Sequence, residues 1–190
     1  MADPITKQQL IDALTKTRDE ALTTLRAVPA ETFAEGRYEN GWNGREILAH
    51  VASIEWTYPR LLDLAQQAPA DGQRTADSTQ QSAAAAPVQR TADDGSATSA
   101  PAPNILSYND RQVEKRAGVP VADLIAEFEK NRNTLIAAVQ AADDELLSRT
   151  IRSAGGITGA VADVIAAVAN GHVQMHVADV AGNEWKGARF

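Results

Sequence analysis

Apolar residues recur at three- and four-residue spacing in four separate segments of this chain. Such spacing places them on one face of an α-helix, and a long run of it predicts an amphipathic helix. None of the sequence shows a convincing alternation of apolar and polar residues, the pattern typical of a half-buried strand. Helices that each have one face to bury pack against one another as a bundle. We therefore predict an all-α fold, a four-helix bundle.

Two of the predicted helices begin with a capping box, in which a polar side chain before the helix and one three residues later bond to each other's backbone N–H groups. The two boxes are Thr6 with Gln9 and Asn43 with Glu46. The first helix ends before Pro29. The second extends to about Gln67, with a kink at Pro59, because proline interrupts helical hydrogen bonding.

The second half of the sequence predicts a short helix and two long ones. The short helix covers about 108–116, and the third long helix starts near Pro120, since proline is favoured in a first turn. After a glycine-containing loop, Thr158 is expected to cap the fourth long helix, which runs to about Val180.

Segment 68–103 differs from the rest of the chain in composition. It consists mainly of Ala, Gln, Ser, Thr, Asp and Pro, and the short sequence Gln-Arg-Thr-Ala-Asp at 73–77 returns at 89–93. Such a segment buries too little apolar surface to offset the entropy of ordering it. We predict a disordered or loosely ordered insertion between the second and third long helices of a single domain, residues 1–190.

Charge and composition exclude several classes of function. The chain has 25 acidic and 18 basic residues and a net charge of −7, and no Lys/Arg cluster marks a nucleic-acid-binding face. It contains no cysteine, which excludes disulfides, thiolate metal sites and a cysteine nucleophile. Neither a signal peptide nor an apolar stretch of about 18 residues is present, so we expect a cytoplasmic protein that does not bind membranes.

The only three histidines fall on two of the predicted helices. His50 lies about two turns after the cap of the second helix, and His172 and His176 lie near the end of the fourth. Residues four apart share one face of a helix, so the last two imidazoles point the same way. If the two helices are antiparallel neighbours, the start of one meets the end of the other. All three imidazoles would then converge.

Three neutral imidazoles suit Zn²⁺, with Ni²⁺, Cu²⁺, Co²⁺ and Fe²⁺ as competitors. Three protein ligands leave a coordination position open, as in catalytic zinc sites. The competing interpretation is structural, since a histidine on an amphipathic helix is commonly just a packed or half-exposed side chain. A purely structural bundle with unrelated histidines therefore stays open as an alternative.

Other polar and aromatic residues near the histidines are weaker candidates. Asp179 could accept a hydrogen bond from an imidazole N–H and so orient that ring, although a solvated carboxylate in the last turn is the simpler interpretation. Glu46 lies one turn before the first histidine, with capping as its simpler role. Trp56 could wall a substrate pocket or pack in the core. Tyr58 and Arg60 could contact an anionic substrate, with surface roles as the default. No residue is assigned a catalytic role.

The residues around the histidines also carry a family resemblance. The stretch Gly-Trp-Asn-Gly-Arg-Glu-Ile-Leu-Ala-His-Val at 41–51 resembles the first motif of the DinB-like metalloenzymes. That superfamily includes the YfiT-type hydrolases and the N-terminal domain of the mycothiol-dependent maleylpyruvate isomerase. The sequence Asn-Gly-His at 170–172, followed by His176, is similar to its closing motif. Segment 108–139 looks closest to the branch that contains the ClbS/DfsB-type proteins.

The resemblance implies an up-down-down-up four-helix bundle and a divalent metal bound by His50, His172 and His176. Some members of the isomerase branch have a carboxylate where this chain has His172. This difference weakens a direct carry-over of the isomerase activity to this chain. The resemblance implies a metal-dependent enzyme acting on a small molecule, in which the metal activates a water (a hydrolase) or a low-molecular-weight thiol cosubstrate (a transferase). The alternative is a non-catalytic bundle that sequesters a small molecule or binds a protein partner. Alanine-rich helix faces are compatible with a homodimer.

Overall fold

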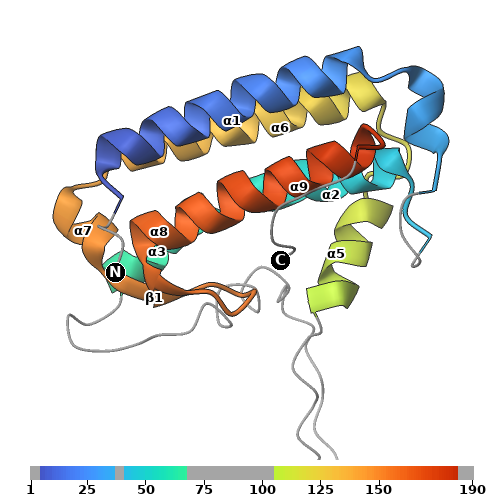
Figure 1. Ribbon diagram of the computed structural model, residues 1–190. Helices are drawn as coiled ribbons and strands as arrows, with labels where there is room; N and C mark the ends of the chain where they lie inside the picture. The colour runs from blue at the N-terminus through green and yellow to red at the C-terminus, as the bar shows by residue number, and fades with distance from the viewer. Residues whose placement is uncertain (1–4, 37–40, 68–104, 184–190) are drawn as a thin grey trace, which may run out of the picture.

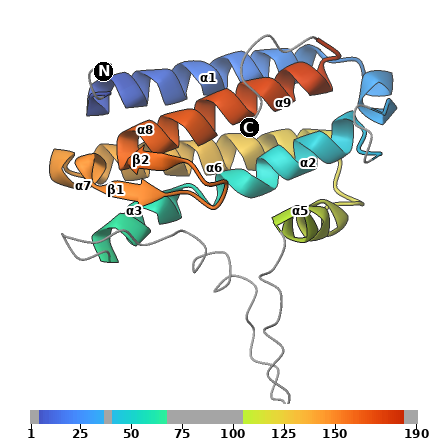
Figure 2. The same cartoon turned by 60° about the horizontal axis from the view of Figure 1, so that its bottom comes forward.

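The computed structural model describes residues 5–36, 41–67 and 105–183. Within these ranges the chain is mainly helical, and four long helical rods pack side by side (Figures 1 and 2). The predicted all-α four-helix bundle is therefore confirmed. The insertion predicted at 68–103 lies outside the described residues.

The rods are made of one or more helices each. In chain order they are α1 (Lys7–Ala27), then α2 (Gly44–Glu55) with α3 (Pro59–Gln67), then α6 (Val121–Ala141), and finally α8 (Val161–Ala166), the π-helical turn η2 (Ala167–Gly171) and α9 (His172–Val180). Shorter elements connect them, namely η1 (Ala30–Ala34), α5 (Ile105–Glu114), α7 (Asp144–Ser148), β1 (Thr150–Arg152) and β2 (Thr158–Ala160).

The rods follow the up-down-down-up topology. The α1 rod and the α8–α9 rod run in one direction, whereas α2–α3 and α6 run in the other (Figure 1). Around the bundle, α1 contacts α6 and α9, and α2 contacts the same two helices. The N-terminus of α2 consequently lies beside the C-terminus of α9, which is the arrangement that the histidine prediction requires.

Both predicted capping boxes are present. Thr6 Oγ1 accepts from Gln9 N at 3.2 Å and Asn43 Oδ1 accepts from Glu46 N at 2.9 Å, with the reciprocal bonds also formed. Directly after the second cap, Gly44 passes close to η1. A Cβ at this position would lie 3.2 Å from both Phe33 Cα and the Thr32 carbonyl oxygen. Glycine therefore lets the start of α2 pack against the backbone of η1.

The second rod is broken rather than kinked. α2 ends at Glu55 and α3 begins at Pro59, so the prediction of one helix with a kink at Pro59 was wrong. The proline ring would clash with the carbonyl four residues earlier, that of Glu55, and proline has no N–H to donate. Thr57 N and Tyr58 N instead bond to Ile54 O and Glu55 O at 2.9 and 3.2 Å, which closes α2 in a tight turn.

The fourth rod starts differently from the prediction. Thr158 lies in a strand, and β1 pairs with β2 in an antiparallel hairpin in which Thr158 faces Arg152. The prediction that Thr158 caps the helix was wrong, because α8 begins at Val161 with Ala160 as its N-cap. The expectation of no strands was also wrong. The two strands were missed because three residues are too few to show an alternating pattern. α7, capped by Asp143, was not predicted.

The core is divided in two by a layer of buried polar residues. The apolar residues form two clusters, one toward each end of the bundle. In three of the rods one buried polar side chain lies between the two clusters, namely Thr17 on α1, Glu55 on α2 and Arg132 on α6. Among the helices of the described residues, none is long and apolar enough to span a membrane.

Candidate metal centre

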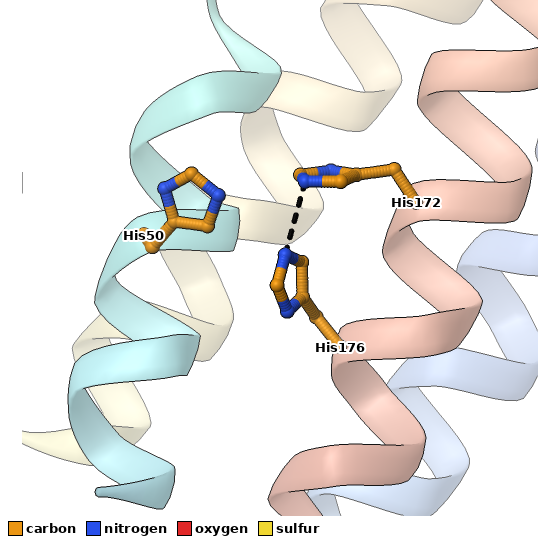
Figure 3. Close-up of side chains that lie close together, drawn as sticks. All are labelled: His50, His172 and His176. Carbon is orange, nitrogen blue, oxygen red and sulfur yellow. Dashed lines mark hydrogen bonds between the residues drawn. The ribbon is translucent and has the colours of Figure 1, made fainter. Parts of the chain in front are cut away.

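The structure brings the three histidines together from two neighbouring helices. His50 extends from α2 toward α9, which carries His172 and His176 (Figure 3). One ring nitrogen from each residue lies within 4.8 Å of the others. The ring centroids of His50 are 5.4 Å from those of His172 and 5.1 Å from those of His176, in edge-to-face arrangements. Nε2 of His172 lies 2.9 Å from Nε2 of His176.

The π-helical turn determines which way these side chains face. The predicted apolar stripe ran from Ile165 through Val168 to His172. In the structure Val168 and His172 are only half-buried, whereas Ile165, Ala169, Val173 and Val177, each four residues apart, are among the buried residues of this rod. One extra residue in a turn rotates the helix beyond it by about 100°. Valines therefore enter the core from α9, and the two histidines face α2 instead.

Burial favours the neutral form of two of the imidazoles, those of His50 and His172. The side chains of His50 and His176 are buried, and His172 is half-buried. Desolvation, together with the nearby His172, lowers the pKa of His50 to about 3. Desolvation also lowers the pKa of His172 to about 4. At neutral pH both rings are unprotonated and carry a free lone pair, which is the form that binds metal.

The donor set fits a divalent transition metal. Nδ1 of His50 is buried without a hydrogen-bond partner among the described residues. No hydrogen bond to these residues therefore offsets the cost of burying this polar nitrogen. Two nitrogens on one zinc ion, each at about 2.0–2.1 Å, lie about 3.3 Å apart in a tetrahedral site. The 2.9 Å between the two Nε2 atoms is close to this value, and the third nitrogen lies within 4.8 Å of both.

Two further polar groups lie against the outer nitrogens of the α9 histidines. Oδ2 of Asp179 is 3.8 Å from Nδ1 of His176, and Asp179 is buried, so the interpretation as a solvated carboxylate was wrong. The Tyr58 hydroxyl is 3.5 Å from Nδ1 of His172 and donates to the Val168 carbonyl oxygen at 3.0 Å. Tyr58 is buried, so its expected surface role was wrong, and burial raises its pKa, which keeps the hydroxyl protonated.

The other predicted residues have different surroundings. Glu46 accepts a hydrogen bond from Asn43 N at 2.8 Å, in its capping role. Trp56 lies under the guanidinium of Arg60, which is 3.8 Å from the ring centroid.

The aromatic ring that lies against the histidines is that of Trp42, 5.4 Å from His50 between centroids, and sequence reasoning missed it. Trp42 directly precedes the cap of α2. A large side chain at that position commonly packs back on the helix, which is the signal that could have identified it.

A buried ion pair was also missed. Arg132 and Glu55 are both fully buried, and the guanidinium donates to both carboxylate oxygens at 2.7 and 2.8 Å. Arg132 follows Leu124 and Phe128 at four-residue spacing on the buried face of α6. A charged residue in phase with an apolar stripe is the pattern that could have revealed the pair.

The comparisons with known proteins agree with this architecture. The family model that matches the chain, over residues 13–180, describes the DinB superfamily. YfiT from Bacillus subtilis, described as a probable metal-dependent hydrolase with an unusual four-helix bundle topology, superposes with a TM-score of 0.63 at 12% identity, covering 96% of this chain and 89% of YfiT. No curated protein matches in sequence.

Two structures of the mycothiol-dependent maleylpyruvate isomerase, one of them a mutant, superpose with TM-scores of 0.62 and 0.63, both at 14% identity. Each covers 93% of this chain, but this chain spans only 61% of the isomerase. At such identities the likeness establishes the fold alone.

Proposed function

Because this chain belongs to the DinB superfamily, we propose that it is a divalent-metal-dependent enzyme that acts on a small molecule. The observation that carries the proposal is the convergence of the His50, His172 and His176 nitrogens within 4.8 Å. Zn²⁺ is the first candidate, because three neutral imidazoles with open positions are typical of catalytic zinc sites. When bound, the metal supplies a Lewis acid that lowers the pKa of a coordinated O–H or S–H group.

The surrounding residues orient the two α9 ligands. A histidine that offers Nε2 to a metal carries its proton on Nδ1 and usually donates it to a fixed partner. For His176 the Asp179 carboxylate, 3.8 Å from Nδ1, is too distant for a direct hydrogen bond, but its charge favours a proton on that nitrogen. For His172 the partner is the Tyr58 oxygen, at 3.5 Å. The 2.9 Å contact between the Nε2 atoms requires a proton on one of them, and that proton leaves or moves to Nδ1 when both nitrogens become ligands.

The reaction is of one of two related kinds, hydrolysis or transfer of a low-molecular-weight thiol. Hydrolysis is supported by the likeness to YfiT, a probable metal-dependent hydrolase, and use of a thiol by the likeness to the isomerase, which depends on mycothiol. We test hydrolysis first, because the likeness extends over 89% of YfiT and 61% of the isomerase. Trp42, beside His50, supplies an aromatic surface against which an apolar part of the substrate can lie.

We also propose that the chain forms a single bundle domain with an insertion at 68–103, works in the cytoplasm and associates as a homodimer. Size-exclusion chromatography with light scattering tests the dimer. Deletion of 68–103 with retention of metal binding tests the domain assignment.

The proposed function is tested by metal analysis of protein purified without a histidine tag. We expect about one equivalent of a transition metal, lost in His50→Ala, His172→Ala and His176→Ala. Gln174→Ala, a substitution on α9 between the two histidines, serves as the control and should keep the metal. Less than about 0.1 equivalent in the wild-type protein after incubation with zinc or nickel would contradict the proposal.

Activity is then assayed with and without added thiol. Metal-dependent turnover of an ester or other electrophile in water alone identifies a hydrolase. Turnover that requires glutathione, bacillithiol or mycothiol identifies a thiol transferase. Stoichiometric metal binding without turnover in either assay favours the non-catalytic sequestering bundle.

A further inference from the structure

The buried Arg132–Glu55 pair is placed to control the shape of the fourth rod. Besides both oxygens of Glu55, the Arg132 guanidinium donates to the carbonyl oxygen of Ala169, to that of Leu14 at 3.4 Å and to the Asn170 side-chain oxygen at 3.5 Å. Ala169 and Asn170 belong to η2, the π-helical turn just before His172. One arginine thus connects α6, α2 and α1 to the turn that precedes a candidate ligand.

A π-helical turn is rare and departs from the regular hydrogen bonding of an α-helix, so contacts from outside the helix are needed to favour it. In η2 the N–H of His172 bonds to Ala167 O, five residues back, rather than to the carbonyl four residues back. The next two carbonyls receive side-chain donors, since Tyr58 donates to Val168 O at 3.0 Å and Arg132 donates to Ala169 O. Both donors come from other rods, so tertiary contacts stabilise the widened turn.

The π-helical turn also sets the direction in which the side chains of His172 and His176 point. With η2 present, Val173 and Val177 fill the core, and His172 and His176 face His50. If the turn relaxed to an ordinary α-helix, α9 would rotate by about 100° relative to α8. The two imidazoles would then turn away from α2.

We propose that Arg132, paired with Glu55 and assisted by Tyr58, is a positioning residue that maintains the π-helical turn and so directs His172 and His176 toward His50. The proposal rests on the metal-binding function proposed above. It assigns to the buried pair a role that packing alone would not need, because apolar side chains of similar volume can replace a buried ion pair without loss of the fold.

The test compares the double variant Arg132→Met/Glu55→Leu with the wild-type protein. The variant removes both charges together and leaves neither unpaired, so we expect it to remain helical and to melt cooperatively. We expect its cobalt affinity to fall about 10- to 100-fold, the range typical of residues that orient metal ligands, and the visible absorption bands of bound cobalt to shift. Tyr58→Phe should lower the affinity by less.

The matched control is Arg116→Met/Glu127→Leu. This pair is also bidentate, with distances of 2.6 to 3.2 Å, but it joins the α5–α6 connection to α6. Its removal should leave cobalt affinity and spectrum unchanged. Unchanged affinity and spectrum in Arg132→Met/Glu55→Leu would overturn the proposal. If that variant does not fold, Arg132→Lys is measured in its place, because lysine keeps the charge beside Glu55 but lacks the planar fork that also reaches Ala169 O.

A second readout separates this proposal from the proposed function. If wild-type protein takes up no cobalt, the metal-binding function fails, and the positioning role is judged on the metal-free protein. Amide hydrogen exchange at His172 and the ring nitrogen shifts of His172 and His176 should then change in Arg132→Met/Glu55→Leu and stay constant in the control. No change in either quantity overturns the positioning role on its own.

Discussion

The indole of Trp42 lies against the imidazole of His50, with ring centroids 5.4 Å apart and the planes tilted by 43°. The contact joins the residue before the cap of α2 to a candidate ligand two turns into the same helix. It places a natural optical reporter directly beside the proposed metal centre.

We expect Ni²⁺, Cu²⁺ or Co²⁺ to quench the tryptophan emission of the wild-type protein, because ions with partly filled d shells quench a nearby indole efficiently. Zn²⁺, with a filled shell, should quench far less. Trp42→Phe should remove most of the quenching while keeping the aromatic surface, whereas Trp56→Phe should leave it. Equal quenching in the two variants would show that the metal lies elsewhere.

Asp179→Asn should weaken metal binding about tenfold without unfolding the protein. The carboxylate lies 3.8 Å from Nδ1 of His176, and loss of its charge removes the electrostatic attraction that favours a proton on that nitrogen. Asp63→Asn, on an exposed position of α3, is the control. Titration calorimetry measures both. Identical affinities would mean that Asp179 does not orient the ring.

The stability of the metal-free protein should fall as the pH drops below about 6.5. Burial lowers the pKa of His50 from 6.5 to about 3 and that of His172 to about 4. At a pH between the unfolded pKa and the lowered pKa, the unfolded chain binds protons that the folded chain does not, so acid favours unfolding. The free energy of unfolding keeps falling until the pH reaches the pKa values of the folded protein. Urea unfolding at pH 7.5, 5.5 and 4.5 measures the slope.

His50→Leu provides the comparison for the pH effect. It removes one of the shifted groups and keeps an apolar side chain in its place, so its free energy of unfolding should depend less on pH over the same interval. A slope equal to that of the wild-type protein would show that other groups account for the acid sensitivity.

Gly44→Ala should destabilise the fold by about 1–3 kcal/mol, the usual cost of forcing an extra methyl group into a packed site. The added Cβ would meet backbone atoms of Phe33 and Thr32 at 3.2 Å, and backbone cannot move as easily as a side chain. Gly118→Ala is the matched control, because a Cβ there meets nothing within 4 Å. Thermal melts compare the two. Equal melting temperatures would mean that η1 shifts freely.

The features of the fold that depend on local pattern could be predicted from the sequence. The capping boxes at Thr6 and Asn43 and the apolar faces of the long helices follow from spacing and residue type, which is why the fold class was accessible. Pro59 marked the site of the interruption in the second rod, but it did not show that α2 ends at Glu55. Proline shows where a helix is interrupted, whereas tertiary packing decides how the chain continues.

Features that depend on several rods at once were not predictable. The π-helical turn leaves no residue signature of its own, and its stabilising donors, Tyr58 and Arg132, come from distant positions in the chain. A helical wheel drawn without that turn places His172 in the core. The approach of His50 to the α9 pair was predictable only because antiparallel neighbours bring the N-terminus of α2 to the C-terminus of α9.

The layer of buried charge also limits how the rods can slide along one another. Burial of apolar side chains is non-directional, so a helix shifted by one turn, about 5.4 Å, can still bury its apolar face. Arg132 has no such freedom, since a shift would leave it and Glu55 unpaired in an apolar interior. The pair therefore selects one alignment of α6 with α2 along the bundle axis. Arg132 also donates to Ala169 O in the fourth rod, so the same alignment extends to the rod that carries His172 and His176.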